Sequence, residues 1–279
     1  MFRGRGYIYS VVILVLDALI GGWFGCMVAA ITAVYAFFIG EWYAKKKYGA
    51  ISCDVSFSSQ RYKLQQCFLR VNSKANQKYA HMPKNTKIYI IPDQKIQAYA
   101  FGWRSIGVTE GALNLDPRTL EALIAHEVGH IVNGDSVLNM ALSANAIGLV
   151  VLMAFCQFAI IAVVYLFVII ACLFGLFKLN FLSFMVTTKL TGLLNKIGKV
   201  IQQGAFYVFQ IVIRAFGRKG EIMADSFACS LGYGFYLRRF LERFDTTGSQ
   251  RDSLLDVIYA THPSSEVRIR NIKKNSNSV

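Results

Sequence analysis

The chain has 279 residues, of which 54% are hydrophobic and only 16% are charged. This composition excludes an intrinsically disordered protein, and with a mean hydropathy of +0.41 it predicts a protein that lies in a membrane. The formal net charge of +14 would suit a nucleic-acid-binding protein if the chain were soluble. Beside membrane spans, the same charge is typical of basic flanks that face anionic lipid. We therefore expect the lipid bilayer as a partner and no nucleic acid.

Residues 1–43 are predicted to form a membrane anchor. The segment Ala18–Gly40 contains no charged residue and is long enough for one span of about 20 residues. Alternatively, Gly21 and Gly22 turn a tight hairpin, which the basic residues on both sides of the apolar run favour through the positive-inside rule. Each half of such a hairpin would have only about 15 residues, which is short for a span. The sequence leaves both alternatives open.

Residues 44–135 are expected to form the first part of a catalytic domain. An amphipathic helix is predicted over Tyr62–Lys78, because apolar residues recur there among charges and glutamines. Further along, Asp116 and Pro117 are typical of the N-cap and the first position of a second helix. Between these helices, three β-rich segments predict short strands at 86–91, 96–101 and 104–109.

Residues 136–216 are predicted to lie in the membrane. The segment Ser136–Phe177 has no charged residue, and as one helix it would be roughly 63 Å long, about twice the thickness of a hydrocarbon core. This segment contains either two spans or one span with long extensions. If it contains one span, a second span lies near 200–216. The lysines between 178 and 199 favour two spans within the first segment, because the other assignment exports them. Residues 217–279 are expected to be helical and to complete the catalytic domain.

Residues 126–130 read HEVGH, an H-E-x-x-H motif within a predicted helix. His126 and His130 are four residues apart, so both imidazoles leave the same face of the helix and can reach one Zn²⁺. Glu127 lies beside the first of them and can accept a proton from water that the metal activates. Gly129 leaves room for close packing behind the metal. The motif predicts one zinc ion per chain, because imidazole and carboxylate ligands favour zinc.

A catalytic zinc site needs a third protein ligand and an open position. Glu221 and Asp225 are four residues apart and lie on one face of a predicted helix. From the residues alone, Glu221 is as compatible with a solvated surface charge as with a metal ligand. Asp225 can likewise form an ion pair with Arg218 or Lys219.

Further motifs follow HEVGH in a distinctive order. They are NGD at 133–135, apolar segments, E-x-x-x-D-x-x-A beginning at Glu221, and THP at 261–263. The segment IQAYA at 96–100 is similar to a strand that reads N-A-F-A, with Gln97 in place of the asparagine. This combination resembles the HtpX-type membrane zinc metallopeptidases, which are relatives of the CAAX prenyl proteases. The resemblance extends from about Thr86 to Arg270.

The resemblance implies an α+β fold that is mainly helical, with a zincin-like catalytic domain, a small β-sheet and about three to four transmembrane helices. It implies one membrane segment after HEVGH and one before Glu221. Glu221 would be the third zinc ligand beside His126 and His130, and Glu127 would be the general base. Asp225 would accept a hydrogen bond from a ligand imidazole and so fix its tautomer.

Two further parts of the chain are candidates for contacts with the substrate. His262 either donates to the oxyanion of the transition state or caps a helix that begins near Ser264. The strand at 96–101 is expected to be an exposed edge that binds an extended peptide by β-strand addition. The residues proposed for this contact are Gln97, Ala98, Tyr99 and Ala100.

The resemblance implies a membrane-bound zinc endopeptidase that acts in quality control on misfolded or damaged membrane proteins. His126 and Glu221 must then lie on the same side of the membrane, because metal–ligand bonds are about 2 Å long and the hydrocarbon core is about 30 Å thick. The basic flanks predict that this side is the cytoplasm and that the protein crosses the cell membrane several times. The alternative is a non-catalytic membrane protein with a structural or sensory zinc, which would need a closed site with four ligands.

Overall fold

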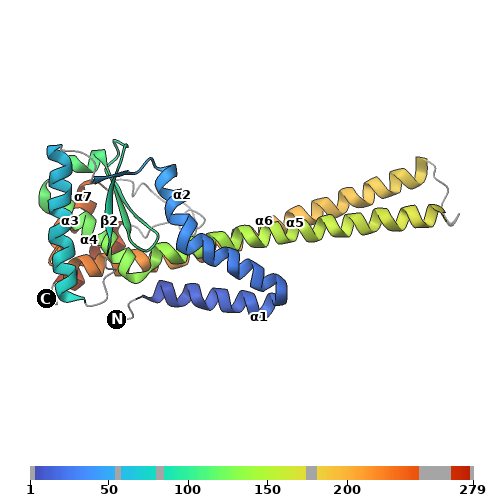
Figure 1. The fold of residues 1–279 in the computed structure, drawn as a ribbon, viewed down its shortest axis with the longest axis horizontal. Coiled ribbons are helices and arrows are strands. Elements are labelled where there is room, and N and C mark those ends of the chain that lie inside the picture. The colour runs from blue at the N-terminus through green and yellow to red at the C-terminus, as the bar shows by residue number, and fades with distance from the viewer. Residues whose placement is uncertain (1–3, 54–57, 80–84, 174–180, 245–264, 277–279) are drawn as a thin grey trace. The chain divides into compact units, whose positions relative to one another are not determined.

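The computed structural model describes residues 4–53, 58–79, 85–173, 181–244 and 265–276. The chain divides into two compact units, whose elements are labelled in Figure 1. Unit 1 contains residues 1–144 and 213–279, and unit 2 contains residues 145–212. His262 and the rest of the THP motif lie outside the described residues.

The N-terminal segment of unit 1 consists of α1 (Arg5–Val34), the π-helix η1 (Tyr35–Ile39) and α2 (Gly40–Lys47). Gly22 interrupts α1 with φ 52° and ψ −136°, which is far from helical geometry. A Cβ on Gly25 would overlap the carbonyl oxygen of Asp17, although eight residues of straight helix span about 12 Å. The two halves of α1 therefore double back on each other, as Figure 1 shows. The structure thus has a turn at Gly22, as the hairpin alternative predicts, and the anchoring of this segment in a membrane stays a prediction.

Unit 1 also contains a four-stranded sheet in the order β1-β2-β4-β3. Its strands are β1 (Ile51–Ser52), β2 (Lys87–Ile91), β3 (Ala98–Phe101) and β4 (Ser105–Thr109). β2 and β4 are parallel, and the other two pairs are antiparallel. The three predicted strands are present and β1 was not expected. β3 is an edge strand, and it begins later than predicted because the Gln97 N–H donates to the side chain of Thr109.

One face of the sheet packs against helices α3 (Ser59–Lys78) and α4 (Pro117–Asn133). Alternate residues of a strand point to the same face, so β2 and β4 direct their even-numbered apolar side chains toward these helices. The 3₁₀ helix η3 (Glu110–Asn114) connects β4 to α4, and α7 (Gly234–Phe244) and α9 (Ser265–Ser276) complete the unit. The core that these elements share includes Leu64, Val71, Ile88, Ile90, Ile106, Val108, Leu120, Ile124, Val128, Leu237 and Ile272.

Two long helices extend from unit 1 into unit 2: α5 (Asp135–Leu173) and α6 (Phe181–Ser230). α5 is continuous, so it lacks the turn that two spans within 136–177 would need. Within unit 2 the two helices lie side by side (Figure 1). Gln157 of α5 donates a hydrogen bond to Asn195 Oδ1 of α6 at 2.7 Å.

The long apolar helices can be compared with the predicted number of membrane spans. Among the described residues, two segments are long and apolar enough to cross a membrane: Gly25–Lys47 and Asp135–Leu173. The sequence predicted about three to four spans, and that larger number stays a prediction.

Candidate metal centre

The HEVGH motif occupies the second half of α4, and the local sequence fixes both ends of this helix. At its start, the Asp116 side chain accepts hydrogen bonds from the backbone N–H groups of Arg118 and Thr119, at 3.1 and 3.0 Å. At its end, Gly134 has φ +74°, a left-handed conformation that glycine adopts at low cost. The chain therefore turns sharply after α4, and Asp135 begins α5 close to the end of the motif.

A close contact between α4 and α6 brings Glu221, the predicted third ligand, to the motif. A Cβ on Gly129 would lie 2.9 Å from Cα and 3.2 Å from Cβ of Ala224, so a larger residue would push the helices apart. Glu221 lies one helical turn before Ala224 and so faces the two histidines. The close packing that the sequence predicted at Gly129 is thus provided by α6.

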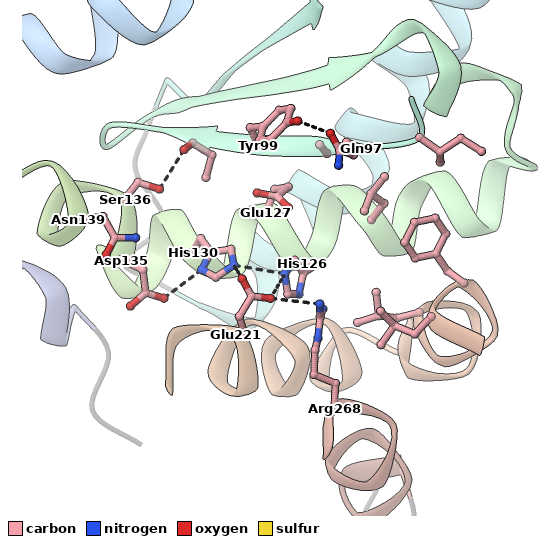
Figure 2. A pocket seen from close by; sticks show the side chains of 17 residues that line it. Gln97, Tyr99, His126, Glu127, His130, Asp135, Ser136, Asn139, Glu221 and Arg268 are labelled. Atoms are coloured by element: carbon pink, nitrogen blue, oxygen red, sulfur yellow. Dashed lines mark hydrogen bonds and ion pairs between the residues drawn. The ribbon is translucent and has the colours of Figure 1, made fainter. Parts of the chain in front are cut away.

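Three ligand-type side chains meet at this contact (Figure 2). His126 Nε2 lies 3.2 Å from His130 Nε2 and 3.3 Å from Glu221 Oε2. His130 Nε2 lies 3.5 Å from Glu221 Oε1. Ligand atoms of a tetrahedral zinc site with bonds of about 2.0–2.2 Å lie about 3.3–3.6 Å apart, so the donor set and its spacing fit a zinc ion. Within the described residues no fourth His, Cys, Asp or Glu joins this group.

A buried carboxylate supports His126 from behind. Asp225 Oδ1 lies 2.9 Å from His126 Nδ1, an ion-pair contact that is less well directed than an ideal hydrogen bond. Arg268 of α9 holds the same carboxylate with two hydrogen bonds, of 2.9 Å to Oδ2 and 2.7 Å to Oδ1. Arg268 Nη1 also lies 3.2 Å from Glu221 Oε2. Among the described contacts, Asp225 therefore pairs with Arg268 and His126, whereas the sequence suggested Arg218 or Lys219 as its ion-pair partner.

A second carboxylate supports His130. Asp135 Oδ2 lies 3.1 Å from His130 Nδ1, and both side chains are largely buried. A carboxylate at this nitrogen favours the tautomer with the proton on Nδ1, which leaves Nε2 free to bind a metal. Each histidine thus has the same orientation: Nε2 toward the shared site and Nδ1 toward a carboxylate.

These contacts change the pKa values of the histidines. Burial alone would lower the pKa of His126, but its contacts with Asp225 and Glu221 raise it above the ordinary value. Burial also acts to lower the pKa of His130, while Asp135 and Glu221 raise it well above that value. For Asp225, burial would raise the pKa, and the contacts with His126 and Arg268 lower it. The site thus stabilises positive charge at the position where a metal cation would bind.

A cavity of about 360 Å³ opens over these residues, between α4, β3 and α7. Glu127 lies on the side of α4 that faces β3, and the cavity is also lined by Tyr99 of β3 and by Gln97, which directly precedes this strand (Figure 2). The Tyr99 hydroxyl donates to Gln97 Oε1. The wall formed by α7 is apolar and contains Leu237, Phe240 and Leu241.

The backbone of β3 has one edge turned toward this cavity. The Gln97 carbonyl accepts a hydrogen bond from Thr109 N–H at 3.1 Å, and in an antiparallel pair such bonds alternate along the strand. The N–H and C=O groups of Ala98 and Ala100 therefore point away from β4. Ser136 Oγ donates to the Ala100 carbonyl at 3.1 Å, which anchors the end of the strand to the start of α5.

The structure brings most of the sequence-predicted site residues to one place. The residues that line the common cavity are Gln97, Ala98, Tyr99, Ala100, His126, Glu127, His130 and Glu221, with Asp225 directly behind His126. Sequence reasoning missed the roles of Asp135 and Arg268. The helix-ending Gly134 was the local signal for Asp135, because it turns the next residue back toward the motif. Arg268 had no local signal, since it is 43 residues from its partner.

Comparisons with known proteins agree with this arrangement. Residues 58–276 match the description "Peptidase family M48". A protease HtpX homolog of Nostoc sp. is 35% identical over 144 residues, which cover 48% of this chain and 46% of the relative. A protease HtpX homolog of Aquifex aeolicus is 31% identical over 157 residues, covering 52% and 49%. The matched stretch thus spans about half the length of these curated relatives.

A solved structure has a similar fold. The S. mikatae Ste24p crystal structure aligns with a TM-score of 0.52 and 16% identity, over 96% of this chain and 62% of that one. The resemblance to HtpX-type peptidases, predicted from HEVGH and the motifs after it, is confirmed. Because the family match covers most of the sequence, the chain belongs to peptidase family M48.

Proposed function

We propose that this protein is a membrane-bound zinc endopeptidase in which Glu127 is the general base. The observation that carries the proposal is the meeting of three ligand-type side chains at 3.2–3.5 Å beside Glu127, in one cavity. His126, His130 and Glu221 would hold one zinc ion per chain. When bound, the metal supplies Lewis-acid chemistry, which makes water more acidic and polarises the scissile carbonyl.

The side chains of the protein transfer the proton and orient the metal ligands. The Glu127 carboxylate is mostly buried and takes a proton from the attacking water, then returns it to the amine nitrogen of the leaving product. Asp225 and Asp135 keep the ring protons of the two histidines at Nδ1. His262 remains a candidate donor to the oxyanion.

The substrate would bind as an extended peptide along β3. Support comes from the edge position of β3 and from the outward direction of the Ala98 and Ala100 backbone groups. Recognition by the backbone gives affinity with little dependence on sequence, which suits a peptidase with many polypeptide substrates. We infer that these include misfolded membrane proteins, because the same chain carries apolar helices long enough to cross a membrane.

We propose that α5 and α6 form a hairpin through the membrane and that the catalytic unit faces the cytoplasm. Two crossings return the chain to the side of His126, as one shared metal requires. The basic residues on that side support a cytoplasmic location: Lys45, Lys46, Lys47, Arg214, Arg218 and Lys219.

Cysteine labelling tests this topology. Single cysteines at Ser73, Thr188 and Ser276 are placed in a background without the six native cysteines. We expect positions 73 and 276 to resist a membrane-impermeant thiol reagent in intact cells and position 188 to react. Opposite labelling of positions 73 and 276 would rule out Glu221 as a ligand of the HEVGH metal.

The test of the catalytic proposal is Glu127→Gln, with metal analysis and a casein proteolysis assay on the full chain. The variant should keep its zinc and its fold, and should lose proteolysis by several orders of magnitude, because both proton transfers need the carboxylate. The matched control is Glu110→Gln, the same change at an exposed acid that contacts Gln94. Undiminished turnover by Glu127→Gln would overturn the proposed function.

A further inference from the structure

The N-terminal hairpin contributes a buried arginine to the surroundings of His130. Arg5 Nη2 donates to Asp135 Oδ1 at 3.3 Å, and Asp135 Oδ2 lies 3.1 Å from His130 Nδ1. Arg5 and Asp135 are each only 6% exposed. A continuous chain of polar contacts therefore leads from the first turn of α1 to one nitrogen of the metal-binding pair.

Close packing fixes the position of Arg5 relative to α4. A Cβ on Gly6 would overlap the backbone carbonyl of Gly134, so the start of α1 rests directly on the C-terminal end of the HEVGH helix. The Tyr7 hydroxyl donates to the Ile131 carbonyl at 3.1 Å. A Cβ on Gly134 would in turn lie 2.6 Å from the Tyr7 ring. The hairpin thus docks at the residue that turns the chain toward Asp135.

The Asp135 carboxylate needs a partner in this environment. A buried carboxylate without a counter-charge is costly, and one oxygen of Asp135 is already directed at His130. Among the residues that the structure describes, Arg5 is the one arginine or lysine within ion-pair distance of it. Gly220 also lies close to the Asp135 carboxylate, since a Cβ on this glycine would be 3.0 Å from Asp135 Oδ2. The backbone of α6 therefore also restricts this carboxylate.

We propose that Arg5 is a positioning residue of the metal centre: it holds Asp135 in the orientation that fixes the His130 ring. The N-terminal hairpin is then part of the metal site as well as a membrane anchor. The proposal rests on the metal-binding part of the proposed function and is independent of the role of Glu127.

The test is a double-mutant cycle on the zinc affinity of the full chain in detergent, measured by competition with a chromogenic chelator. Loss of a group that orients a metal ligand typically weakens metal binding by about 10- to 100-fold. We expect Arg5→Gln to weaken zinc binding by about tenfold and Asp135→Asn by somewhat more. The double variant should match Asp135→Asn alone, because Arg5 acts only through Asp135. Unchanged affinity in Arg5→Gln, or additive losses, would overturn the proposal.

Two controls separate positioning from simple docking of the hairpin. Tyr7→Phe removes the hydrogen bond to Ile131 and leaves Asp135 untouched, so its zinc affinity should stay within about twofold of the wild type. Arg5→Lys keeps the charge and should recover part of the lost affinity. Equal losses in Tyr7→Phe and Arg5→Gln would mean that the hairpin only docks, which contradicts the proposal.

A spectroscopic readout distinguishes this proposal from the proposed function. The visible absorption of bound Co²⁺ should shift in Arg5→Gln and Asp135→Asn, and should be unchanged in Tyr7→Phe. If the wild type binds no zinc or Co²⁺, the proposed function fails with it. If the wild type binds both and Glu127→Gln abolishes proteolysis while Arg5→Gln leaves affinity and spectrum unchanged, only the role of Arg5 fails.

Discussion

The two histidines of the HEVGH helix are supported from opposite ends of the chain. Behind His126, Asp225 is fully buried and receives two hydrogen bonds from Arg268, at 2.9 and 2.7 Å. Behind His130, Asp135 receives one hydrogen bond of 3.3 Å from Arg5. Both supports join an imidazole, a carboxylate and an arginine, but the first is bidentate and the second has a single contact.

This difference indicates unequal rigidity. A bidentate arginine–carboxylate pair fixes both distance and plane, whereas a single hydrogen bond from arginine constrains the carboxylate less. His126 is therefore the more firmly placed of the two predicted ligands. His130 depends on the N-terminal hairpin, which must itself dock on α4.

The largest expected effect is common to both supports and comes from Glu221, which lies 3.3 Å from one histidine and 3.5 Å from the other. Glu221→Ala should weaken zinc binding by more than about 100-fold, beyond the range for loss of an orienting group, because it removes a proposed ligand. Isothermal titration with zinc at neutral pH measures this loss, and Arg218→Ala on the same helix is the control. If both variants hold zinc equally, the third ligand lies elsewhere.

Next in size are changes to the support of His126. Arg268→Gln and Asp225→Asn should each weaken zinc binding by about 10- to 100-fold, because either change breaks the bidentate pair that holds the His126 ring. Dialysis against zinc buffers of known free concentration gives the affinities. Arg270→Gln, on the same helix α9, serves as the comparison. Wild-type affinity in both site variants would show that His126 needs no such support.

The support of His130 should give a smaller loss. Asp135→Asn is expected to weaken zinc binding less than Asp225→Asn does, since the contact it breaks is held by one hydrogen bond rather than two. Measuring both variants in one chelator series decides the order. A larger loss in Asp135→Asn would reverse the ranking and make the N-terminal support the dominant one.

The smallest expected effect concerns β3, which lines the same cavity as both histidines. Ser136→Ala removes the hydrogen bond to the Ala100 carbonyl and should raise KM for an extended peptide by about two- to tenfold with kcat little changed. Steady-state kinetics with a fluorogenic peptide measures the change, with Ser73→Ala on α3 as the control. A lower KM in Ser136→Ala would instead mean that the serine competes with substrate for the strand edge.

The parts of the site that could be predicted from sequence are those with local signals. The Asp116 cap, the following proline and the four-residue spacing of the histidines all act within α4, and each is present in the structure. Glu221 was reached through the resemblance to HtpX-type peptidases, and the approach of Ala224 to Gly129 explains how it comes near the histidines.

The remaining features depend on partners far away in the chain. Arg5 and Arg268 contact carboxylates 130 and 43 residues distant, and no local pattern distinguishes them from surface arginines. β1 has only two residues and exists because it pairs with β2, so its own sequence carries little strand signal. The lysines between 181 and 199 and the possible span near 200–216 were expected as separate features, yet both lie in α6, one helix of 50 residues.

The most direct test of the central claim is X-ray absorption at the zinc edge of the purified, zinc-loaded protein. We expect two imidazole nitrogens at about 2.0–2.1 Å and carboxylate oxygen at about 2.0–2.2 Å, with one of the two nitrogens lost in His126→Ala. A zinc–sulfur distance of about 2.3 Å, or a spectrum unchanged by His126→Ala, would place the metal on other residues, such as the cysteines, and contradict the account.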